Sequence, residues 1–452
     1  MDSYLEEFIK KNSNFLKLGR IFNPDTQKPH KMNIFNSFIV DKKRDDKDFI
    51  QYSNNALKLY KELYGLNYKD NKIHILNVTG ALAGCEYLRA ILPSKYLNRE
   101  SDIVSIYSSQ VTPELLAWSD IIIICRIYNE NFHNIWVNQK KLGKVVIYDI
   151  DDNLHEVPVS NPAYSTYNKK NKSLSNIIKI MNIVDYVTVT NDRLANYYAK
   201  LIDDPKKIKV FKNCLDLEKT RGINKEFKYK DKIRIGWSGS HTHYEDLLII
   251  NDALIKLKKK YKEQLEIVLY GWDGLIRKMT IDKENKKLST KFDGGVLLNI
   301  DKEFNSFTSY EEYLHKLEDL DLDIAVIPLK KNIFNIDGKS NLKFLDFASC
   351  KVPCIVSDIP TYTDTVTHNE NALIAKNTTE DWIEKIELLM NDYELRKRIG
   401  TNGYKLVNDK FNLAKEIHDR ANFYRKNADI LNRLIGVKKK IVKKLNFKPL
   451  KK

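Results

Sequence analysis

Short β-prone runs alternate with helical patterns along most of this chain, and this alternation constrains the fold more than any other feature of the sequence. In the first block the clearest run is 121–125, IIIIC. Helical patterns between such runs indicate parallel strands joined by right-handed crossovers. The first block has predicted strands at 73–78, 103–107, 121–125, 145–149, 186–190 and 208–211, and predicted helices at 84–92, 112–118, 130–142, 173–183 and 192–201.

The alternation restarts after a charged connector at 216–232. The second block has predicted strands at 233–237, 266–270, 295–299, 323–327, 353–357 and 372–376, and predicted helices at 246–260, 310–320, 341–350, 379–391 and 393–409. The predicted fold class is therefore α/β, with two doubly wound, Rossmann-like domains that face a cleft.

The predicted domains are 71–215 and 230–410, and three further segments flank them. Residues 1–70 are predicted to form a helical or irregular extension. Residues 411–430 are predicted to form a helix that returns to the N-terminal domain, and residues 431–452 a basic amphipathic tail.

Charge is unevenly distributed over the 452 residues. Of the net charge of +16, Arg425–Lys452 contributes +10, from eleven Lys or Arg and one Asp. Leu434, Val437, Ile441 and Leu445 lie near helical spacing among these lysines, which suits an anionic membrane surface. A Lys-rich arm can also bind nucleic-acid phosphates, and a solvated tail is the third interpretation.

We expect neither a secretion signal nor a membrane span from this sequence. Its start, MDSYLEEFIK, is acidic, and its longest purely aliphatic run is Ile121–Ile124. The five cysteines are scattered and form no Cys-x-x-Cys pair, which favours thiols in a reducing compartment over a metal site. We expect a cytoplasmic protein, with peripheral binding to the inner face of a membrane as an option.

The stretch 233–246, IRIGWSGSHTHYED, combines a predicted strand with a small-residue turn and a helix start. Gly239 and Ser240 permit a tight turn whose backbone N–H groups can hold phosphate, and His241 and His243 could add hydrogen bonds. The stretch lacks both G-K-[ST] and G-x-G-x-x-G, which weakens the P-loop and dinucleotide interpretations. An ordinary strand–helix turn is the alternative.

A second candidate is the stretch 337–357, DGKSNLKFLDFASCKVPCIVS. Lys339, Ser340 and Lys343 lie at the start of a predicted helix and could neutralise a diphosphate without a metal. Asp346 could accept hydrogen bonds from a ribose diol. In a doubly wound domain this turn opens onto the same edge as residues 239–241. A solvated helix face is the alternative.

Together these stretches resemble the GT-B fold glycosyltransferases, in particular the family known as family 4 or glycosyltransferase group 1. KSNLKFLDFASCKVPCIVSDIPTYTD at 339–364 is similar to the family signature K-h-h-E-h-h-A-x-G-x-P-V-h-x-S. YEEYLHKLEDLDLDIAVIPL at 310–329 is similar to the helix that leads to the D-h-h-h-x-P-L strand. The resemblance covers residues 73–425.

The resemblance implies a hexosyltransferase that uses a nucleotide-diphosphate sugar, foremost a UDP-sugar, with no cofactor and no obligatory metal. The acceptor would be a hydroxyl of a cell-envelope, glycan or protein molecule. Donor-binding roles are implied for Gly239, Ser240, His241, Lys339, Ser340, Lys343 and Asp346. The base is expected in the region 271–310, against Gly271, Trp272 and the loop at 304–309.

The chain departs from the family pattern at two places. In the family's E-x7-E pair the second acid usually holds the ribose and the first the donor sugar. Here Asp346 stands at the second position and Gly338 at the first. The usual Arg and Lys after the first donor-domain strand are also absent, so we expect Lys339 and Lys343 to bind the phosphates.

The N-terminal half is expected to hold the acceptor. Gly84, Tyr87 and Arg89 follow the first predicted strand, in a loop and helix that look like the family's acceptor side, although Arg89 could equally be a surface arginine. The stretch VVIYDIDDNLHEVP at 145–158 ends a strand in acidic residues. Asp151, Asp152 and His155 are therefore the predicted catalytic residues, of which one would be the general base. A Mg²⁺ site or a loop cap are the alternatives.

Two other functions stay open. The basic tail would suit a glycosyltransferase that acts on modified bases in DNA. The missing first Glu would suit a non-catalytic module that binds a nucleotide or a glycan.

Overall fold

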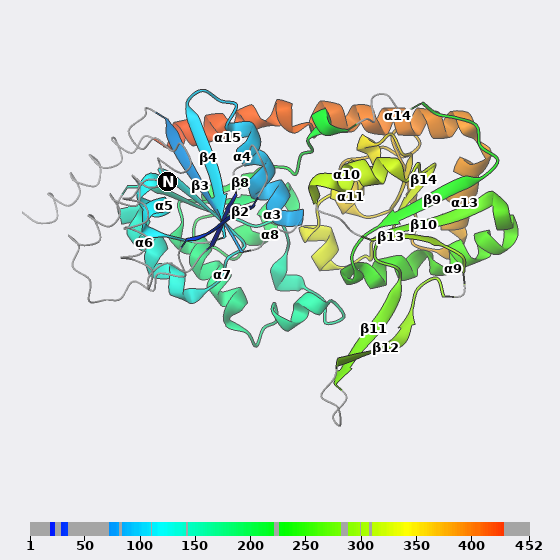
Figure 1. Cartoon of the computed structure of the whole chain (residues 1–452), viewed down its shortest axis with the longest axis horizontal. Coiled ribbons are helices and arrows are strands. Elements are labelled where there is room, and N and C mark those ends of the chain that lie inside the picture. The colour runs from blue at the N-terminus through cyan, green and yellow to red at the C-terminus, as the bar shows by residue number, and fades with distance from the viewer. Residues whose placement is uncertain are drawn as a thin grey trace, which may run out of the picture. The chain divides into compact units, whose positions relative to one another are not determined.

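The computed structural model describes residues 19–22, 29–34, 72–80, 84–109, 111–141, 143–220, 226–281, 288–298, 300–306 and 310–428 (Figure 1). Its contacts divide the chain into two units. The first unit consists of Met1–Asp151, Lys169–Lys212 and Leu413–Lys452, and the second consists of Asp152–Asn168 and Asn213–Asn412. Each unit is built around one Rossmann-like sheet.

The sheet of the first unit has the strand order β2-β1-β4-β3-β5-β6-β7-β8. Its strands are β1 (Gly19–Phe22), β2 (Pro29–Ile34), β3 (Ile73–Thr79), β4 (Ile103–Ser108), β5 (Ile121–Cys125), β6 (Val145–Asp149), β7 (Tyr186–Val189) and β8 (Ile208–Val210). Neighbours from β4 to β8 are parallel, whereas β1 is antiparallel to β2 and β4. Strands β5 and β6 are buried throughout, as expected where helices cover both faces of a sheet.

The helices of the first unit match the predicted ranges closely. They are α3 (Gly84–Glu86), α4 (Leu92–Leu97), α5 (Pro113–Trp118), α6 (His133–Lys141), α7 (Lys172–Ile183), α8 (Asp192–Ala199) and α15 (Leu413–Asn427). A π-helical turn, Tyr87–Ile91, joins α3 to α4. Helix α15 is held to this unit by Arg425, which donates to Asp102 at 2.7–2.8 Å and to Glu100 at 2.6 Å.

The prediction for the N-terminal extension is wrong at two places. Residues 19–22 and 29–34 are strands that extend the sheet, not helical or irregular segments. The rest of 1–70, and the tail at 431–452, lie outside the described residues.

The sheet of the second unit is parallel throughout, with the strand order β13-β10-β9-β14-β15-β16. Its strands are β9 (Ile233–Ser238), β10 (Leu265–Gly271), β13 (Glu303–Ser306), β14 (Ile324–Ile327), β15 (Cys354–Ser357) and β16 (Leu373–Ala375). The helices are α9 (Tyr244–Tyr261), α10 (Tyr310–Asp319), α11 (Leu342–Ser349), α12 (Pro360–Thr363), α13 (Thr379–Asn391) and α14 (Tyr393–Lys410). A separate ribbon is formed by β11 (Leu275–Ile281) and β12 (Leu288–Gly295), which pair only with each other.

The predicted strand at 295–299 is wrong. Strand β12 ends at Gly295, and the next strand of the sheet is β13. Val296 and Leu297 are apolar because their side chains are fully buried in the core, not because they extend a strand; Leu297 has a φ of +56°.

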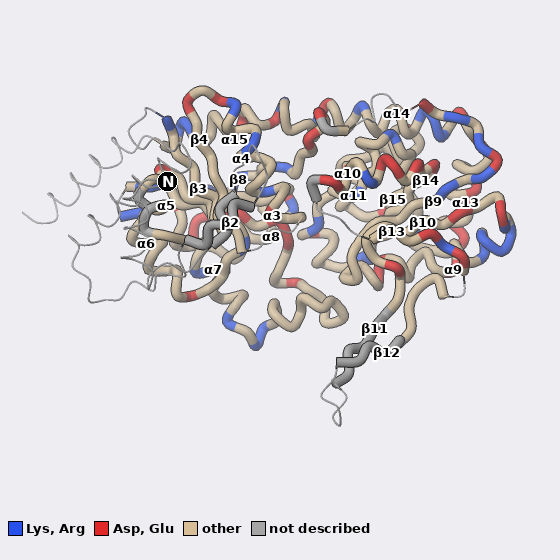
Figure 2. Tube along the Cα trace, viewed as in Figure 1, with Lys and Arg blue, Asp and Glu red and all other residues tan. Residues whose placement is uncertain are grey.

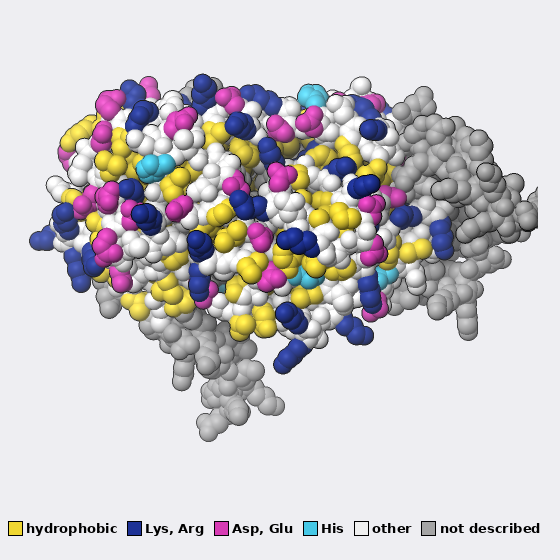
Figure 3. Space-filling view, turned by 180° about the vertical axis from the view of Figure 1, so that it is seen from behind, with side chains coloured by type: hydrophobic (Ala, Val, Ile, Leu, Met, Phe, Trp, Pro, Cys, Tyr) yellow, Lys and Arg dark blue, Asp and Glu magenta, His cyan; other side chains and the backbone are white. Residues whose placement is uncertain are grey.

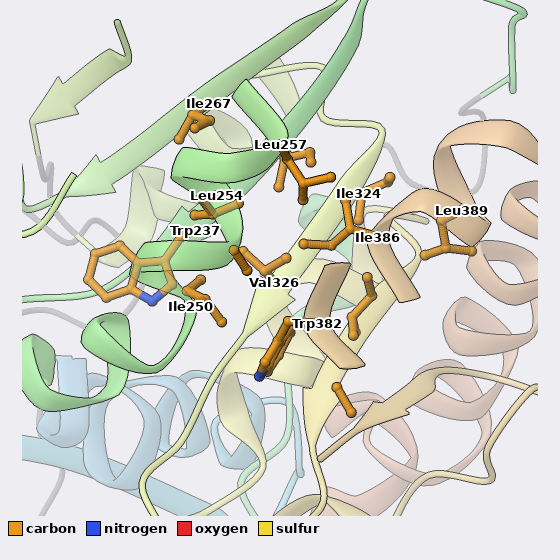
Figure 4. Packing of buried hydrophobic residues seen from close by; sticks show 14 of the residues in the cluster. Trp237, Ile250, Leu254, Leu257, Ile267, Ile324, Val326, Trp382, Ile386 and Leu389 are labelled. Atoms are coloured by element: carbon orange, nitrogen blue, oxygen red, sulfur yellow. The ribbon is translucent and has the colours of Figure 1, made fainter. Parts of the chain in front are cut away.

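The core of the second unit lies between its sheet and helices α9 and α13 (Figure 4). Trp237 from β9, Val326 from β14 and Trp382 from α13 pack there with Ile250 and Leu254 of α9. All five side chains are at most 2% exposed. Helices α9 and α13 therefore pack closely against the sheet through these side chains.

Strand order reverses between β9 and β14, since the chain moves outward from β9 to β13 on one side and from β14 to β16 on the other. In open α/β sheets, ligands bind beyond the carboxyl ends of the strands at such a switch point. The loops after β9 and β14 are therefore the expected position of a ligand-binding site.

Surface charge on the described residues is mixed in sign. Figure 2 shows Lys and Arg interspersed with Asp and Glu along both units, and the face drawn in Figure 3 shows the same mixture. No helix among the described residues is both long and apolar enough to cross a bilayer.

Candidate functional site

Strand β9 ends in a turn where a side chain at position 239 would crowd its neighbours. The backbone N–H of Gly239 donates to the carbonyl of Tyr270 at 3.0 Å. A Cβ atom at this position would lie 2.7 Å from the Trp237 ring and 2.8 Å from the Nζ atom of Lys343. The glycine thus lets the turn, the indole and the lysine come together at the switch point.

Lys343 carries the clearest signal of a binding site. It lies in the first turn of α11, and its Nζ atom is 4.9 Å from the centre of the Trp237 ring. The atom is buried and has no hydrogen-bond acceptor among the residues that the structure describes. Burial lowers the pKa of Lys343 to about 8. A buried ammonium without a hydrogen-bonded partner is costly, so this position is suited to receive an anion.

His243 and Asp246 form a pair at the start of α9, with 2.7 Å between Nδ1 and Oδ2. Burial, and then the charge of Lys343, lower the pKa of His243 to about 4. Burial raises the pKa of Asp246, but the His243 hydrogen bond and nearby charges outweigh it and leave this pKa lowered. The ring is thus neutral at pH 7, and because an ionised carboxylate only accepts, Nδ1 donates and Nε2 is left as an acceptor.

Asp246 is a residue that the sequence analysis missed. Its second oxygen accepts the backbone N–H of Lys330 at 2.8 Å, so it ties the loop after β14 to the start of α9. The signal available in the sequence was the i, i+3 spacing of a histidine and a carboxylate in a first helical turn.

Lys339 and Ser340 precede α11, as predicted, but both already have partners. Lys339 Nζ lies 3.0 Å from Asp152 Oδ2 and 4.8 Å from the centre of the Phe334 ring. The hydroxyl of Ser340 accepts from Asn213 at 3.1 Å. Lys339 is therefore a paired cation, in contrast to Lys343.

Asp346 lies one turn further along α11 and is 3% exposed. Its charge acts on Lys343 and on Tyr313, whose pKa is raised by burial and also by Asp346. Tyr313 is itself held by Ser238 at the end of β9, at 2.7 Å between hydroxyl oxygens. Asp346 is therefore electrostatically coupled to the Lys343 position, and its ribose contact stays a prediction.

The prediction that Trp272 lines a base pocket is wrong. Its indole is 8% exposed and belongs to the core, where it packs edge-on against Trp237 and donates to the carbonyl of Leu275 at 3.0 Å. Phe304 on β13 is 45% exposed, and residues 307–309 lie outside the described residues.

The predicted acceptor-side residues lie in the interior of the first unit. Arg89 is 3% exposed, makes a two-pronged contact with Asp149 at 2.7 and 2.9 Å, and donates to the carbonyl of Phe211. Tyr87 is 9% exposed in the same π-helical turn, and Gly84 is half-buried at the start of α3. The sequence left two interpretations of Arg89, an arginine that faces the acceptor and a surface arginine. The structure instead shows a buried side chain in an ion pair with Asp149.

The predicted catalytic residues follow β6. Asp151 belongs to the first unit and lies 3.3 Å from Arg126, whereas Asp152 and His155 belong to the second unit. Asp151 and Asp152 are each 9% exposed. Among the described residues no group of three His, Cys, Asp or Glu side chains is arranged to hold a metal ion.

Part of the second unit is similar to a known protein family. Residues 218–406 match the family model described as "Glycosyl transferases group 1". An uncharacterized glycosyltransferase of Methanocaldococcus jannaschii is 22% identical over 246 residues, which is 53% of this chain and 58% of that relative. The match therefore spans little more than half of the relative's length.

Solved structures share the fold. A sucrose-phosphate synthase of Thermosynechococcus elongatus has a TM-score of 0.54 at 12% identity, over 78% of this chain and 98% of that one. Anabaena HepE, solved with UDP and glucose, has a TM-score of 0.52 at 12% identity, over 79% and 100%. A glycosyltransferase of Rickettsia africae has a TM-score of 0.52 at 15% identity, over 80% and 100%. These structures are GT-B glycosyltransferases, so the two-sheet architecture is of that fold class.

Proposed function

We propose that this chain, whose residues 218–406 belong to the glycosyltransferase group 1 family, transfers a sugar from a nucleotide-diphosphate sugar to a hydroxyl of an acceptor. The observation that carries the proposal is the buried ammonium of Lys343 at the switch point of the second sheet. The family match supports the reaction class, and the buried ammonium of Lys343 supports a diphosphate site at that position.

A diphosphate bound at Lys343 would be the leaving group of the reaction. When the bond between sugar and diphosphate breaks, negative charge develops on the leaving diphosphate. Lys343 and the backbone N–H groups of Ser240 and His241 meet this charge, since the Gly239 N–H is already bonded to Tyr270. Two further parts of the proposal are a UDP donor, which the UDP complex of Anabaena HepE supports, and independence from an added metal.

The general base is proposed among Asp151, Asp152 and His155, which follow the carboxyl end of β6. We assign the acceptor to the cell-envelope, glycan or protein class and the protein to the cytoplasm. The basic tail is proposed to hold it at an anionic membrane surface, with nucleic acid as the competing ligand of the tail.

A donor screen tests the proposal. The full chain is incubated with UDP-, GDP- and TDP-sugars, with and without EDTA, and nucleotide release is measured. Release from one donor that persists in EDTA and is lost in Lys343→Met is the expected result. Failure of every donor to bind or to release nucleotide would overturn the proposal, and binding without turnover would favour a non-catalytic module.

A further inference from the structure

Residues 152–168, which we name the strap, belong by their contacts to the second unit although the chain on either side belongs to the first. The strap contains two short 3-10 turns, Leu154–Glu156 and Pro162–Ser165. It is fastened to the second unit by the Asp152–Lys339 ion pair at 3.0 Å. It therefore forms part of the wall beside the loop that follows β14.

The strap explains why position 338 is a glycine. A Cβ atom on Gly338 would lie 2.5 Å from Asn153 Cβ and 2.6 Å from Asn153 N, closer than real contacts of this kind. Asn153 is fully buried, and neither polar atom of its amide has a hydrogen-bond partner within the described part of the chain. The position where the family resemblance expects a sugar-binding acid is thus filled by the strap instead.

A pocket opens next to this contact. The strap lines it with Ser160 and Asn161, the start of α9 with Thr242, and the loop after β14 with Asn332 and Asn335. These five side chains carry neutral hydroxyl or amide groups, which both donate and accept hydrogen bonds as sugar hydroxyls require. His243 and Lys339 also line the pocket, so it adjoins the position of Lys343, whose charge acts on His243.

The charged side chains around the pocket are paired with each other. Lys330 lies 3.1 Å from Glu245, Lys339 lies 3.0 Å from Asp152, and His243 lies 2.7 Å from Asp246. A charged ligand group would meet a like charge beside each opposite one and would lose its hydration without a net electrostatic gain, whereas an uncharged polyol meets no such repulsion.

We infer that this pocket binds the sugar of the donor, that it selects an uncharged sugar over an acidic one, and that Ser160 and Asn161 of the strap make part of that selection. The inference rests on the proposed function, because the sugar is identified by its attachment to a diphosphate at Lys343. It adds a substrate class and two specificity residues.

The first test compares donors that share a nucleotide and differ in sugar charge. UDP-glucose is compared with UDP-glucuronate, UDP-galactose with UDP-galacturonate, and GDP-mannose with GDP-mannuronate, as kcat/KM for nucleotide release. We expect the neutral sugar of the accepted pair to be favoured by at least about tenfold, the equivalent of one lost polar contact. Equal or better use of the acidic sugar would overturn the inference.

The second test uses variants of the strap. Ser160→Ala combined with Asn161→Ser should lower kcat/KM for the neutral donor about tenfold and leave the Kd of the free nucleotide within about twofold. Serine is chosen at 161 because the Asn161 side chain accepts from the backbone N–H of Ala163, and a hydroxyl can keep that contact. Asn168→Ala is the matched control, since its amide bonds to Tyr164 and Ser165 within the strap.

The outcomes separate the inference from the proposed function. If the double variant behaves like the wild type, the strap does not select the sugar. The same conclusion holds if its affinity for the free nucleotide and its kcat/KM for the donor fall by the same factor. In both cases the inference fails and the proposed function stands. If the wild type binds none of UDP, GDP and TDP, the proposed function fails and the inference fails with it.

Discussion

Lys343 and Lys339 show how two neighbouring lysines of one motif acquire different roles. Lys339 has a carboxylate partner in Asp152, whereas the ammonium of Lys343 is buried over an indole without a hydrogen-bond acceptor in the described structure. The sequence places both at a helix start and cannot distinguish them. Only packing against Trp237 and the Gly239 turn does so.

The buried charge of Lys343 predicts an unusual pH dependence of stability. Its pKa of about 8 in the folded protein lies below the ordinary value of 10.5, so between these pH values the unfolded chain holds a proton that the folded chain has released. Ligand-free stability should therefore rise with pH across this window. Lys343→Met should be more stable than the wild type at pH 7, by up to about 3 kcal/mol, and equally stable near pH 10.5.

Urea unfolding at pH 7 and at pH 10.5, without nucleotide, measures this difference. A stability difference that does not change with pH would show that Lys343 is not a buried charge in the folded protein.

Gly338 is the second residue whose identity the packing dictates. Gly338→Ala should lower the free energy of unfolding by about 1–3 kcal/mol, because the new methyl group would collide with the backbone of Asn153. Gly80→Ala is the control, since nothing lies within 4 Å of its Cβ position. Thermal unfolding of both variants checks the prediction, and equal midpoints would contradict the close contact between the strap and the loop.

At the scale of elements, strands were predictable where a continuous apolar run coincides with a buried strand, as in β5, β6, β14 and β15. The prediction failed at 295–299, where apolar side chains fill the core from a turn. It also failed at β1 and β2, because β1 joins the sheet through β4, a long-range pairing that no local pattern indicates, and β2 pairs with β1. The Lys343–Gly239 neighbourhood was predictable from doubly wound topology, whereas the Asp246 pair and the strap depend on tertiary contacts.

Arg89 joins three elements of the first unit, namely the π-helical turn, the end of β6 and the segment after β8. Arg89→Met should cost about 3–5 kcal/mol of stability, because it leaves the buried Asp149 carboxylate without its cation. Arg99→Met is the control, since Arg99 stacks on Tyr96 at the end of α4 and is largely solvated. Chemical unfolding distinguishes the two variants; a stable Arg89→Met protein with a raised KM for the acceptor would favour the acceptor role instead.

At the scale of the whole molecule, the chain crosses between its two units more than once. The strap belongs to the second unit between stretches of the first, and α15 belongs to the first unit although the chain up to Asn412 belongs to the second. The family match at 218–406 lies within the second unit, so the donor site has the stronger support and the acceptor is assigned by proposal. The tail beyond residue 428 contributes half of the net charge, +8 of +16, in 24 residues.

Deleting residues 429–452 tests the role of that charge. The deletion removes nine Lys or Arg and Asp429, which lowers the net charge from +16 to +8. Binding to phosphatidylserine vesicles should fall at least about tenfold at physiological salt, while nucleotide release and the unfolding midpoint should not change. Unchanged vesicle binding, or a larger loss of DNA binding than of vesicle binding, would contradict the membrane proposal.

The most direct test of a diphosphate site at Lys343 is the affinity of the free nucleotide for Lys343→Met, measured by calorimetry at pH 7. Lys351→Met is the matched control, because Lys351 lies just beyond the other end of α11, with its ammonium 5.4 Å from the centre of the Tyr404 ring. We predict that Lys343→Met weakens UDP binding by at least about a hundredfold, the equivalent of one desolvated charge-assisted contact. Lys351→Met should bind UDP like the wild type. Equal affinity in all three proteins would contradict the claim that the diphosphate binds at Lys343.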